Sequence, residues 1–138
     1  MKLVSVNLVP EKNVTSSSAV VKMLSPLCIR LHKAENNSDK YISVANPDFT
    51  EIAKQVIKEQ LVENGFDEKL ISNFEIKPLN AKKTVVYHYK NYIECSLGSF
   101  SINADKSVII YLLKSGIGSR KSAGFGFAEL LSEGGEPN

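Results

Sequence analysis

The sequence has no tryptophan, two histidines and two cysteines in 138 residues, and no apolar run near the roughly 20 residues that span a bilayer. The cysteines, Cys28 and Cys95, match no metal-ligand or redox spacing, and the acidic residues are scattered. We therefore predict no metal site and no cofactor, and each cysteine lies in an apolar run that is typical of a small buried hydrophobe. The N-terminus has neither the apolar core nor the cleavage site of a signal peptide, so we expect a cytoplasmic protein with no membrane partner.

A strong net charge is also absent. Seventeen lysines and arginines face fifteen acidic residues, which leaves a net charge of +2. No overall field therefore indicates a nucleic-acid partner, and any basic surface must be local. The chain is 43% hydrophobic and long enough to bury one core. We expect a single domain over residues 1–131 and a polar tail over 132–138.

Apolar and polar residues alternate in several segments, as they do in strands with one buried face. The predicted strands are 3–9, 19–32, 73–80, 83–90, 92–102 and 125–131. Pro26 interrupts the second of them, which indicates an edge position or a bulge. Turns are predicted at 35–39 and at Asn91.

Two helices are predicted between these strands. Residues 49–61 carry apolar side chains at helical spacing, Asp48 lies at the capping position before them, and Gly65 is placed to end the helix. Asp105 precedes a second apolar stretch that ends before Gly116. The β-branched residues in that stretch leave a strand open as the alternative.

The predicted order is strand, helix, two strands, helix and strand, with an extra N-terminal strand. This order is the split βαβ pattern of ferredoxin-like, RRM-like α+β domains. We therefore expect an antiparallel sheet with two helices packed on one face, and with the other face open to a ligand or a partner domain.

The glycine-rich segment from Gly116 to Gly126 is the strongest functional signal. Four of the chain's eight glycines lie in it, with Arg120 and Lys121 between them. Glycine lets a backbone approach an anion closely and the two cations supply charge, so the segment favours a phosphate-binding loop. A dinucleotide fingerprint would need a glycine at position 121, and a P-loop would need Gly-Lys-Ser or Gly-Lys-Thr. The alternative is structural: Gly116 ends a helix, and Gly124 and Gly126 allow tight packing.

Two stretches carry a family resemblance. The run GIGSRKSAGFGFAEL at 116–130 resembles the C-terminal glycine-rich signature of the CRISPR-associated repeat-RNA-processing endoribonucleases of the RAMP (repeat-associated mysterious protein) superfamily. The run MLSPLCIR at 23–30 resembles the strand that opens the second ferredoxin-like domain of those enzymes. The resemblance extends over residues 3–131. It implies a CRISPR repeat RNA partner and metal-independent RNA cleavage, with the ribose 2′-hydroxyl as nucleophile and a 2′,3′-cyclic phosphate as product.

The resemblance also implies that part of the machinery lies elsewhere. Members of the family usually carry two ferredoxin-like domains in tandem, and this chain resembles the C-terminal one. Their general acid–base histidine lies in the N-terminal domain, so no residue here inherits that role. His32, between Arg30 and Lys33, is the one candidate proton shuttle. The expected partners are repeat RNA and an N-terminal ferredoxin-like domain or other Cas proteins, and a homodimer is left open.

The predicted RNA contacts centre on the glycine segment. The backbone amides of its first three residues approach phosphates, Arg120 and Lys121 neutralise them, and the hydroxyls of Ser119 and Ser122 add hydrogen bonds. The full predicted RNA-binding set is Gly116, Ile117, Gly118, Ser119, Arg120, Lys121, Ser122, Gly124, Gly126, Arg30 and Lys33.

Other functions stay open at this point. One alternative is a non-catalytic RAMP module that packs against another Cas domain. Another is a small ferredoxin-like enzyme for acyl phosphates, which would need a converging arginine and asparagine that the sequence does not supply. Tyr87, Tyr89 and Tyr92 are predicted in cross-strand or core packing, with base stacking as the alternative. Lys82 and Lys83 are typical of a solvated hairpin tip, with an RNA contact as the alternative.

Overall fold

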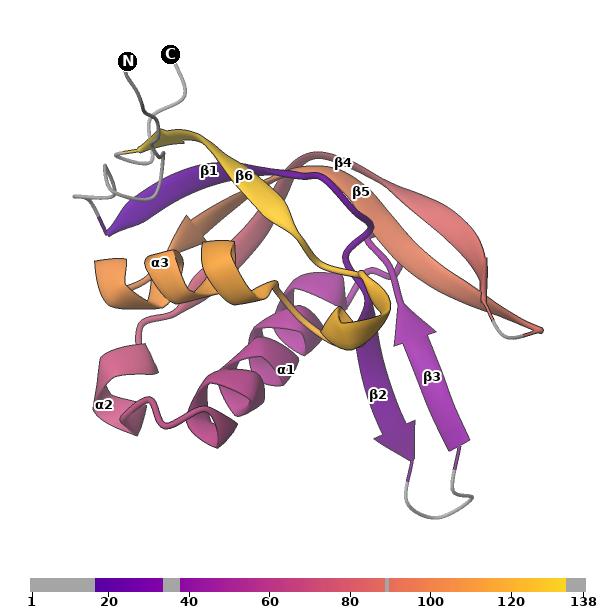
Figure 1. The fold of residues 1–138 in the computed structure, drawn as a ribbon, viewed down its shortest axis with the longest axis horizontal. Coiled ribbons are helices and arrows are strands. Elements are labelled where there is room, and N and C mark those ends of the chain that lie inside the picture. Colours follow the sequence, from indigo (N-terminus) through magenta and orange to yellow (C-terminus); the bar gives the residue numbers. More distant parts are fainter. Residues whose placement is uncertain (1–16, 34–37, 89, 134–138) are drawn as a thin grey trace.

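A four-stranded antiparallel sheet forms the centre of the protein in the computed structural model, which describes residues 17–33, 38–88 and 90–133. The strand order is β4-β5-β1-β6, and β2 and β3 pair separately as an antiparallel hairpin (Figure 1). The strands are β1 (Ser18–Met23), β2 (Ile29–Lys33), β3 (Ser38–Ile42), β4 (Glu75–His88), β5 (Asn91–Asn103) and β6 (Ala128–Glu133).

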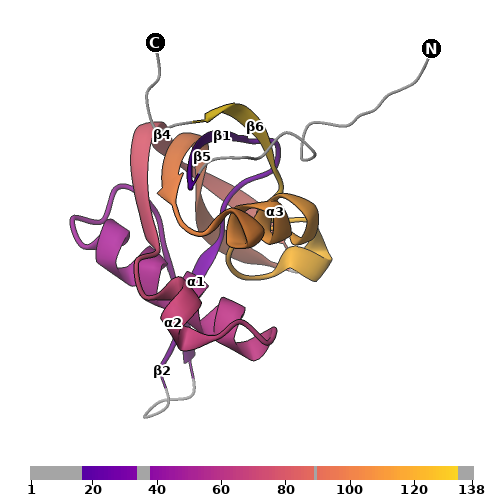
Figure 2. The same cartoon turned by 90° about the vertical axis from the view of Figure 1, so that its left-hand side faces the viewer.

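The connections confirm the ferredoxin-like prediction. Helix α1 (Phe49–Glu63) links β1 to β4, and helix α3 (Lys106–Ser115) links β5 to β6, so two βαβ units interleave in one sheet. Both helices lie on the same side of the sheet (Figure 1 and Figure 2). A four-residue helix, α2 (Glu68–Ile71), follows α1 and was not predicted.

The main core lies between the helices and the sheet. The apolar stripe predicted for α1 is buried, and it packs with residues of α3 and with inward-facing residues of the strands. The fully buried large side chains of this core include Phe74, Phe100, Leu27, Ile57, Leu61, Ile76, Ile102, Ile109 and Leu112. Within the described residues, no helix is long and apolar enough to cross a membrane.

The predicted long strand at 19–32 is instead two strands. The break follows Met23, and the chain turns through Pro26 before it re-forms strand as β2. Leu24 and Ser25 donate their amides to the Phe127 carbonyl at 2.7 and 3.1 Å, so these residues lie beside the segment that follows the glycine loop. The new strand pairs with β3, which the sequence analysis missed and which begins inside the predicted 35–39 turn. The predicted strand at 3–9 falls outside the described residues.

The predicted strands at 73–80 and 83–90 form one strand, β4, with a bulge between Pro78 and Asn80. Near its end, Tyr87 faces Tyr92 of β5 with ring centroids 4.9 Å apart, so the predicted cross-strand packing is confirmed for this pair. Both rings are nevertheless exposed, at 61% and 75%. Tyr89 falls outside the described residues. The last strand begins at Ala128 rather than at residue 125.

Helix α3 begins with the predicted cap. The Asp105 carboxylate accepts hydrogen bonds from the Ser107 hydroxyl and, at 2.9 Å, from the Ser107 amide. The hydroxyl bond first, and the amide bond second, lower the pKa of Asp105. We expect Asp105→Ala to lower the free energy of unfolding by about 1 kcal/mol at pH 7. A carboxyl group whose pKa is lower in the folded than in the unfolded protein stabilises the fold at pH values above the unfolded-state pKa. This stabilisation is lost as the pH falls, so the difference in unfolding free energy between the two proteins should shrink below about pH 4. Urea unfolding of both proteins at pH 7 and pH 3 tests this, and an unchanged difference would contradict it.

Candidate functional site

The glycine loop, residues 116–126 between α3 and β6, is fixed by backbone hydrogen bonds at its base. The Ile117 amide donates to the Gly126 carbonyl, the Gly126 amide to the Pro26 carbonyl and the Ser119 amide to the Cys28 carbonyl, each at 2.8 Å. The loop therefore lies against residues 24–28, which are about ninety positions away in the sequence. Such a loop presents its apex in a fixed shape.

Gln60 of α1 holds the other side of the loop. Its Nε2 donates to the Gly116 carbonyl at 3.1 Å, and its Oε1 accepts from the Gly118 amide at 2.9 Å. The side chain is 8% exposed, so both bonds are shielded from water. Gln60 is not among the predicted site residues, although a glutamine within the apolar stripe of a helix indicates a buried polar contact.

The first three amides of the loop are all used inside the protein. The Gly116 amide donates to Leu112, and those of Ile117 and Gly118 donate to Gly126 and Gln60. The phosphate contacts predicted for these amides are therefore not available in this structure. Close packing, the alternative to phosphate binding, explains the glycine at position 118. A Cβ there would lie 2.6 Å from the Cys28 carbonyl oxygen, and the backbone has a φ of +85°.

The exposed apex runs from Arg120 to Gly124. Arg120 has a left-handed backbone with φ of 56°, and a single 3-10 turn follows over Lys121–Ala123. Within the part of the chain that the structure describes, the amides of Arg120, Lys121 and Ser122 have no acceptor. Ser122 is exposed, whereas the Ser119 hydroxyl already accepts from the Arg30 amide at 3.1 Å. The groups open to a ligand therefore lie at 120–122.

Two tyrosines hold the apex cations. Arg120 donates from Nη1 to the Tyr41 hydroxyl at 3.1 Å, and its guanidinium lies 5.9 Å from that ring's centre. Lys121 donates from Nζ to the Tyr111 hydroxyl at 3.4 Å, with the ammonium 5.6 Å from the ring centre. Neither cation has a carboxylate within salt-bridge distance among the described residues. Their positive charge is positioned but not neutralised, which is the state that an anion-binding site requires.

A cavity of about 590 Å³ opens between the loop, β2 and α1. Arg30, Ser119, Arg120 and Lys121 line one part of it, and residues of α1 line another. With Gly118, the structure thus brings five residues of the predicted RNA-binding set to one hollow. Lys33 and the candidate shuttle His32 lie in β2, but their side chains fall outside the described residues.

A small second hydrophobic core includes Phe125 of the glycine loop. Cys28, Ile93, Cys95 and Phe125 are buried together, and Tyr41 packs against them. Both thiols are free and fully buried, which confirms the prediction of small buried hydrophobes. A hydrogen bond between the thiols lowers the pKa of Cys28 and raises that of Cys95.

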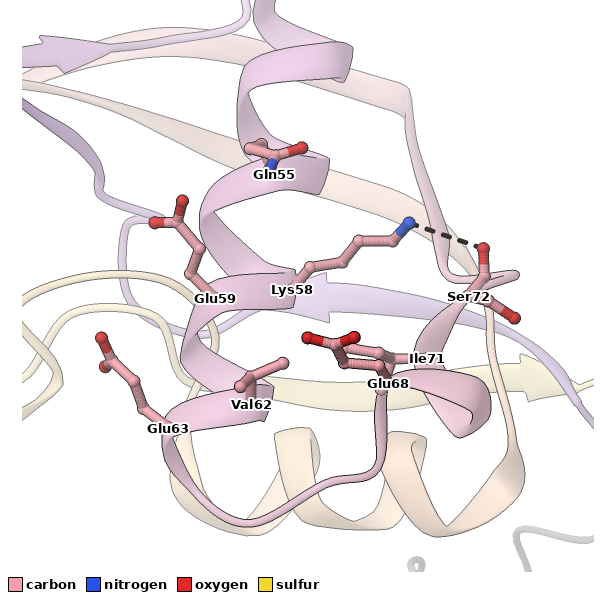
Figure 3. Close-up of a pocket in the computed structure, with 8 residues that line it drawn as sticks. All are labelled: Gln55, Lys58, Glu59, Val62, Glu63, Glu68, Ile71 and Ser72. Atoms are coloured by element: carbon pink, nitrogen blue, oxygen red, sulfur yellow. Dashed lines mark hydrogen bonds between the residues drawn. The ribbon is translucent and has the colours of Figure 1, made fainter.

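A second hollow, of about 530 Å³, lies between α1 and α2 and does not touch the glycine loop. Val62 and Ile71 supply its apolar surface, and Lys58 donates to the Ser72 carbonyl across it at 3.5 Å (Figure 3). Its other lining residues are polar or charged, and Glu59 and Glu63 line this hollow as well as the cavity beside the loop. Among residues 17–33, 38–88 and 90–133, no three His, Cys, Asp or Glu side chains gather as metal ligands would.

Comparisons with known proteins agree with the fold. The family model described as "CRISPR associated protein Cas6, C-terminal" matches residues 9–130. A solved structure titled "An RAMP protein binding different RNA substrates" is 23% identical with a TM-score of 0.73, covering 94% of this chain and 52% of its own. Two further solved structures are similar. One, from a Cas6-related gene of Pyrococcus furiosus, is 22% identical with a TM-score of 0.71, covering 86% of this chain and 50% of its own. The other, titled "CRISPR associated protein Cas6", is 20% identical with a TM-score of 0.67, covering 83% of this chain and 48% of its own. No curated protein matches. The chain thus spans about half the length of each structure.

Proposed function

This chain belongs to the Cas6 C-terminal domain family, and from that premise we propose that it binds CRISPR repeat RNA and serves in its processing. The observation that carries the proposal is the loop apex, where Arg120 and Lys121 are held by tyrosines and have no acidic partner among the described residues. Arg30 lines the same cavity and adds a third positive charge. Three cations around one hollow, two of them held in place by tyrosines, suit the closely spaced phosphates of RNA.

In this proposal the apex contacts phosphates with Arg120, Lys121 and the exposed hydroxyl of Ser122. The unpaired amides of residues 120–122 add donors that need no side-chain ordering. Gly118 and Gly126 act indirectly. Gly118 lets the loop pack closely on Cys28, and Gly126 lets the two ends of the loop pack on each other at Ile117, so both fix the apex. Phosphate contacts of this kind position the RNA, and they carry no sequence information by themselves.

Cleavage itself is proposed for a longer assembly that contains this domain. In the reaction implied by the resemblance, the 2′-hydroxyl oxygen attacks the adjacent phosphorus and loses its proton to a base. The bond to the 5′-oxygen breaks, that oxygen takes up a proton, and a 2′,3′-cyclic phosphate remains. The histidine that moves these protons is proposed to lie in an N-terminal ferredoxin-like domain. The role of this chain is then to hold the scissile strand in place.

The test is RNA binding by the chain over a range of salt concentrations. We expect Arg120→Ala/Lys121→Ala to weaken binding about tenfold or more at low salt. The slope of log K against log salt should also fall by about 1.5 to 2, because two phosphate contacts are lost. The matched control is Lys69→Ala/Lys106→Ala, which removes the same charge from exposed positions outside the cavity. Equal affinities and slopes for both double variants would overturn the proposal.

A second candidate role, a non-catalytic module that packs against another domain, is favoured by one observation. Leu24 is 62% exposed and Leu131 is 52% exposed, and Leu131 lies in β6, an edge strand of the sheet. Exposed leucines at a strand that is the edge of the sheet among the described residues are typical of a protein contact. This role predicts that Leu24→Ser/Leu131→Ser abolishes co-purification with a separately expressed N-terminal ferredoxin-like domain. Retained co-purification would exclude this surface as the contact.

A further inference from the structure

The cavity beside the glycine loop has walls of opposite charge. Arg30, Arg120 and Lys121 line it from β2 and the loop, while Glu59 and Glu63 line it from α1. The two glutamates are four residues apart, so they lie on one face of the helix, one turn apart. Figure 3 shows both side chains on the side of α1 away from α2, and both also line the edge of the hollow between these two helices.

The two charged walls do not neutralise each other. Glu59 and Glu63 make no ion pair or hydrogen bond within the described residues, and the apex cations bond to Tyr41 and Tyr111 instead. Opposite charges that face one space without pairing favour a ligand that satisfies both. Such a ligand carries an anionic group and, elsewhere on the same molecule, a group that donates hydrogen bonds to carboxylates.

We propose that this cavity holds one unpaired guanine nucleotide of the bound RNA. Its phosphate lies against Arg120 and Lys121, and its N1–H and N2–H₂ groups donate to the carboxylates of Glu59 and Glu63. The inference rests on the proposed RNA binding and adds base specificity to the same site. Unpaired RNA bases are commonly read on this Watson–Crick edge.

The chemistry of the carboxylates selects guanine. An ionised carboxylate only accepts hydrogen bonds, and guanine is the one standard base with two adjacent donors on its Watson–Crick edge. Adenine and cytosine each place one amino donor beside a ring acceptor, and uracil has one N–H between two carbonyls. The half-buried Leu31 and Val56 also line the cavity and supply an apolar surface for the face of the base.

The test compares short single-stranded RNAs that differ at one base, bound to the full chain. We expect A₄GA₅ to bind about 10- to 100-fold more tightly than A₁₀, the range of one bidentate base contact. The inosine RNA A₄IA₅, which keeps N1–H but lacks the amino group, should fall between them. In Glu59→Gln/Glu63→Gln the ratio of the affinities for A₄GA₅ and A₁₀ should drop to about one, through weaker binding of A₄GA₅. Glu68→Gln, a matched charge change outside this cavity, should keep the preference.

Each other outcome decides against the inference. An unchanged guanine preference in the Glu59→Gln/Glu63→Gln variant would overturn it. Equal tightening of all three RNAs in that variant would also overturn it, because the carboxylates would then act only by repelling phosphates. A wild-type chain that binds all three RNAs equally, with the Arg120 and Lys121 dependence intact, refutes base reading and leaves the proposed function standing. No RNA binding at all refutes both.

Discussion

Gly126→Ala is expected to lower the free energy of unfolding by about 2 to 5 kcal/mol and to abolish tight RNA binding at the same time. Gly126 has a φ of +88°, and a Cβ built there would lie 2.1 Å from the Ile117 carbonyl oxygen. The contact is with backbone, so no side chain can move aside to relieve it. The same residue accepts from the Ile117 amide and donates to Pro26, so relief by backbone movement breaks the base of the loop.

Gly124→Ala is the matched control for this prediction. Gly124 also has a positive φ, of +95°, but no atom lies within 4 Å of a Cβ built there. The substitution therefore costs the strain of the left-handed backbone, about 1 kcal/mol, and no clash. Thermal unfolding should show a fall in Tm of roughly 10 °C for Gly126→Ala and of a few degrees for Gly124→Ala. Equal falls for the two variants would mean that backbone strain alone, and not packing, explains the glycines of the loop.

The helices could be predicted because their signals are local. The positive φ of Gly65 follows the end of α1, and Asp105 caps α3, as the sequence indicated. Even here a detail differs. Asp48 makes no side-chain cap bond, and the Asn46 side chain accepts the Asp48 amide instead, at 2.8 Å. Both arrangements satisfy an amide at the start of the helix, and sequence spacing alone does not distinguish them.

The β2–β3 hairpin was missed for the opposite reason. Both strands of the hairpin are only five residues long. Charged residues precede Tyr41 in β3, so the sequence pattern of β3 does not differ from that of a polar turn. The break in the long predicted strand depends on contacts with Phe127, a hundred residues further along the chain. Long-range backbone pairing of this kind leaves no periodic signal in either segment.

The candidate site shows the same division between local and long-range information. The position of the glycine loop between a helix and a strand, with two cations in it, could be predicted because glycines and charges are visible in the printed sequence. The sequence did not show which amides are free, because their acceptors come from α1 and from residues 26–28. It also did not bring Glu59 and Glu63 to the loop, since a pair of glutamates on a helix is usually a solvated face. Only tertiary packing makes these distant residues into one cavity.

Gln60→Met is expected to lower the free energy of unfolding by about 2 to 5 kcal/mol and to weaken RNA binding, without touching the RNA. Methionine is similar in length and keeps the packing of the stripe, but it offers no partner to the buried Gly116 carbonyl or to the Gly118 amide. Each unsatisfied buried group costs about 1 to 3 kcal/mol. The apex that follows Gly118 then loses its fixed position. The free-energy cost of ordering the apex then falls on the binding step, which weakens RNA binding.

Amide hydrogen exchange separates this mechanism from a general loss of stability. The Gly118 amide should exchange fast in Gln60→Met under conditions where the amides of β1 and β5 remain protected, because its one acceptor is gone. Gln60→Glu keeps that acceptor and removes the donor to Gly116, so Gly118 should stay protected there while stability still falls. Gln55→Met makes the same chemical change at an exposed position of α1 and should alter neither exchange nor RNA affinity. If Gly118 stays protected in Gln60→Met, the clamp is not what orders the loop, and the positioning of Arg120 and Lys121 must come from the contacts with residues 26–28 alone.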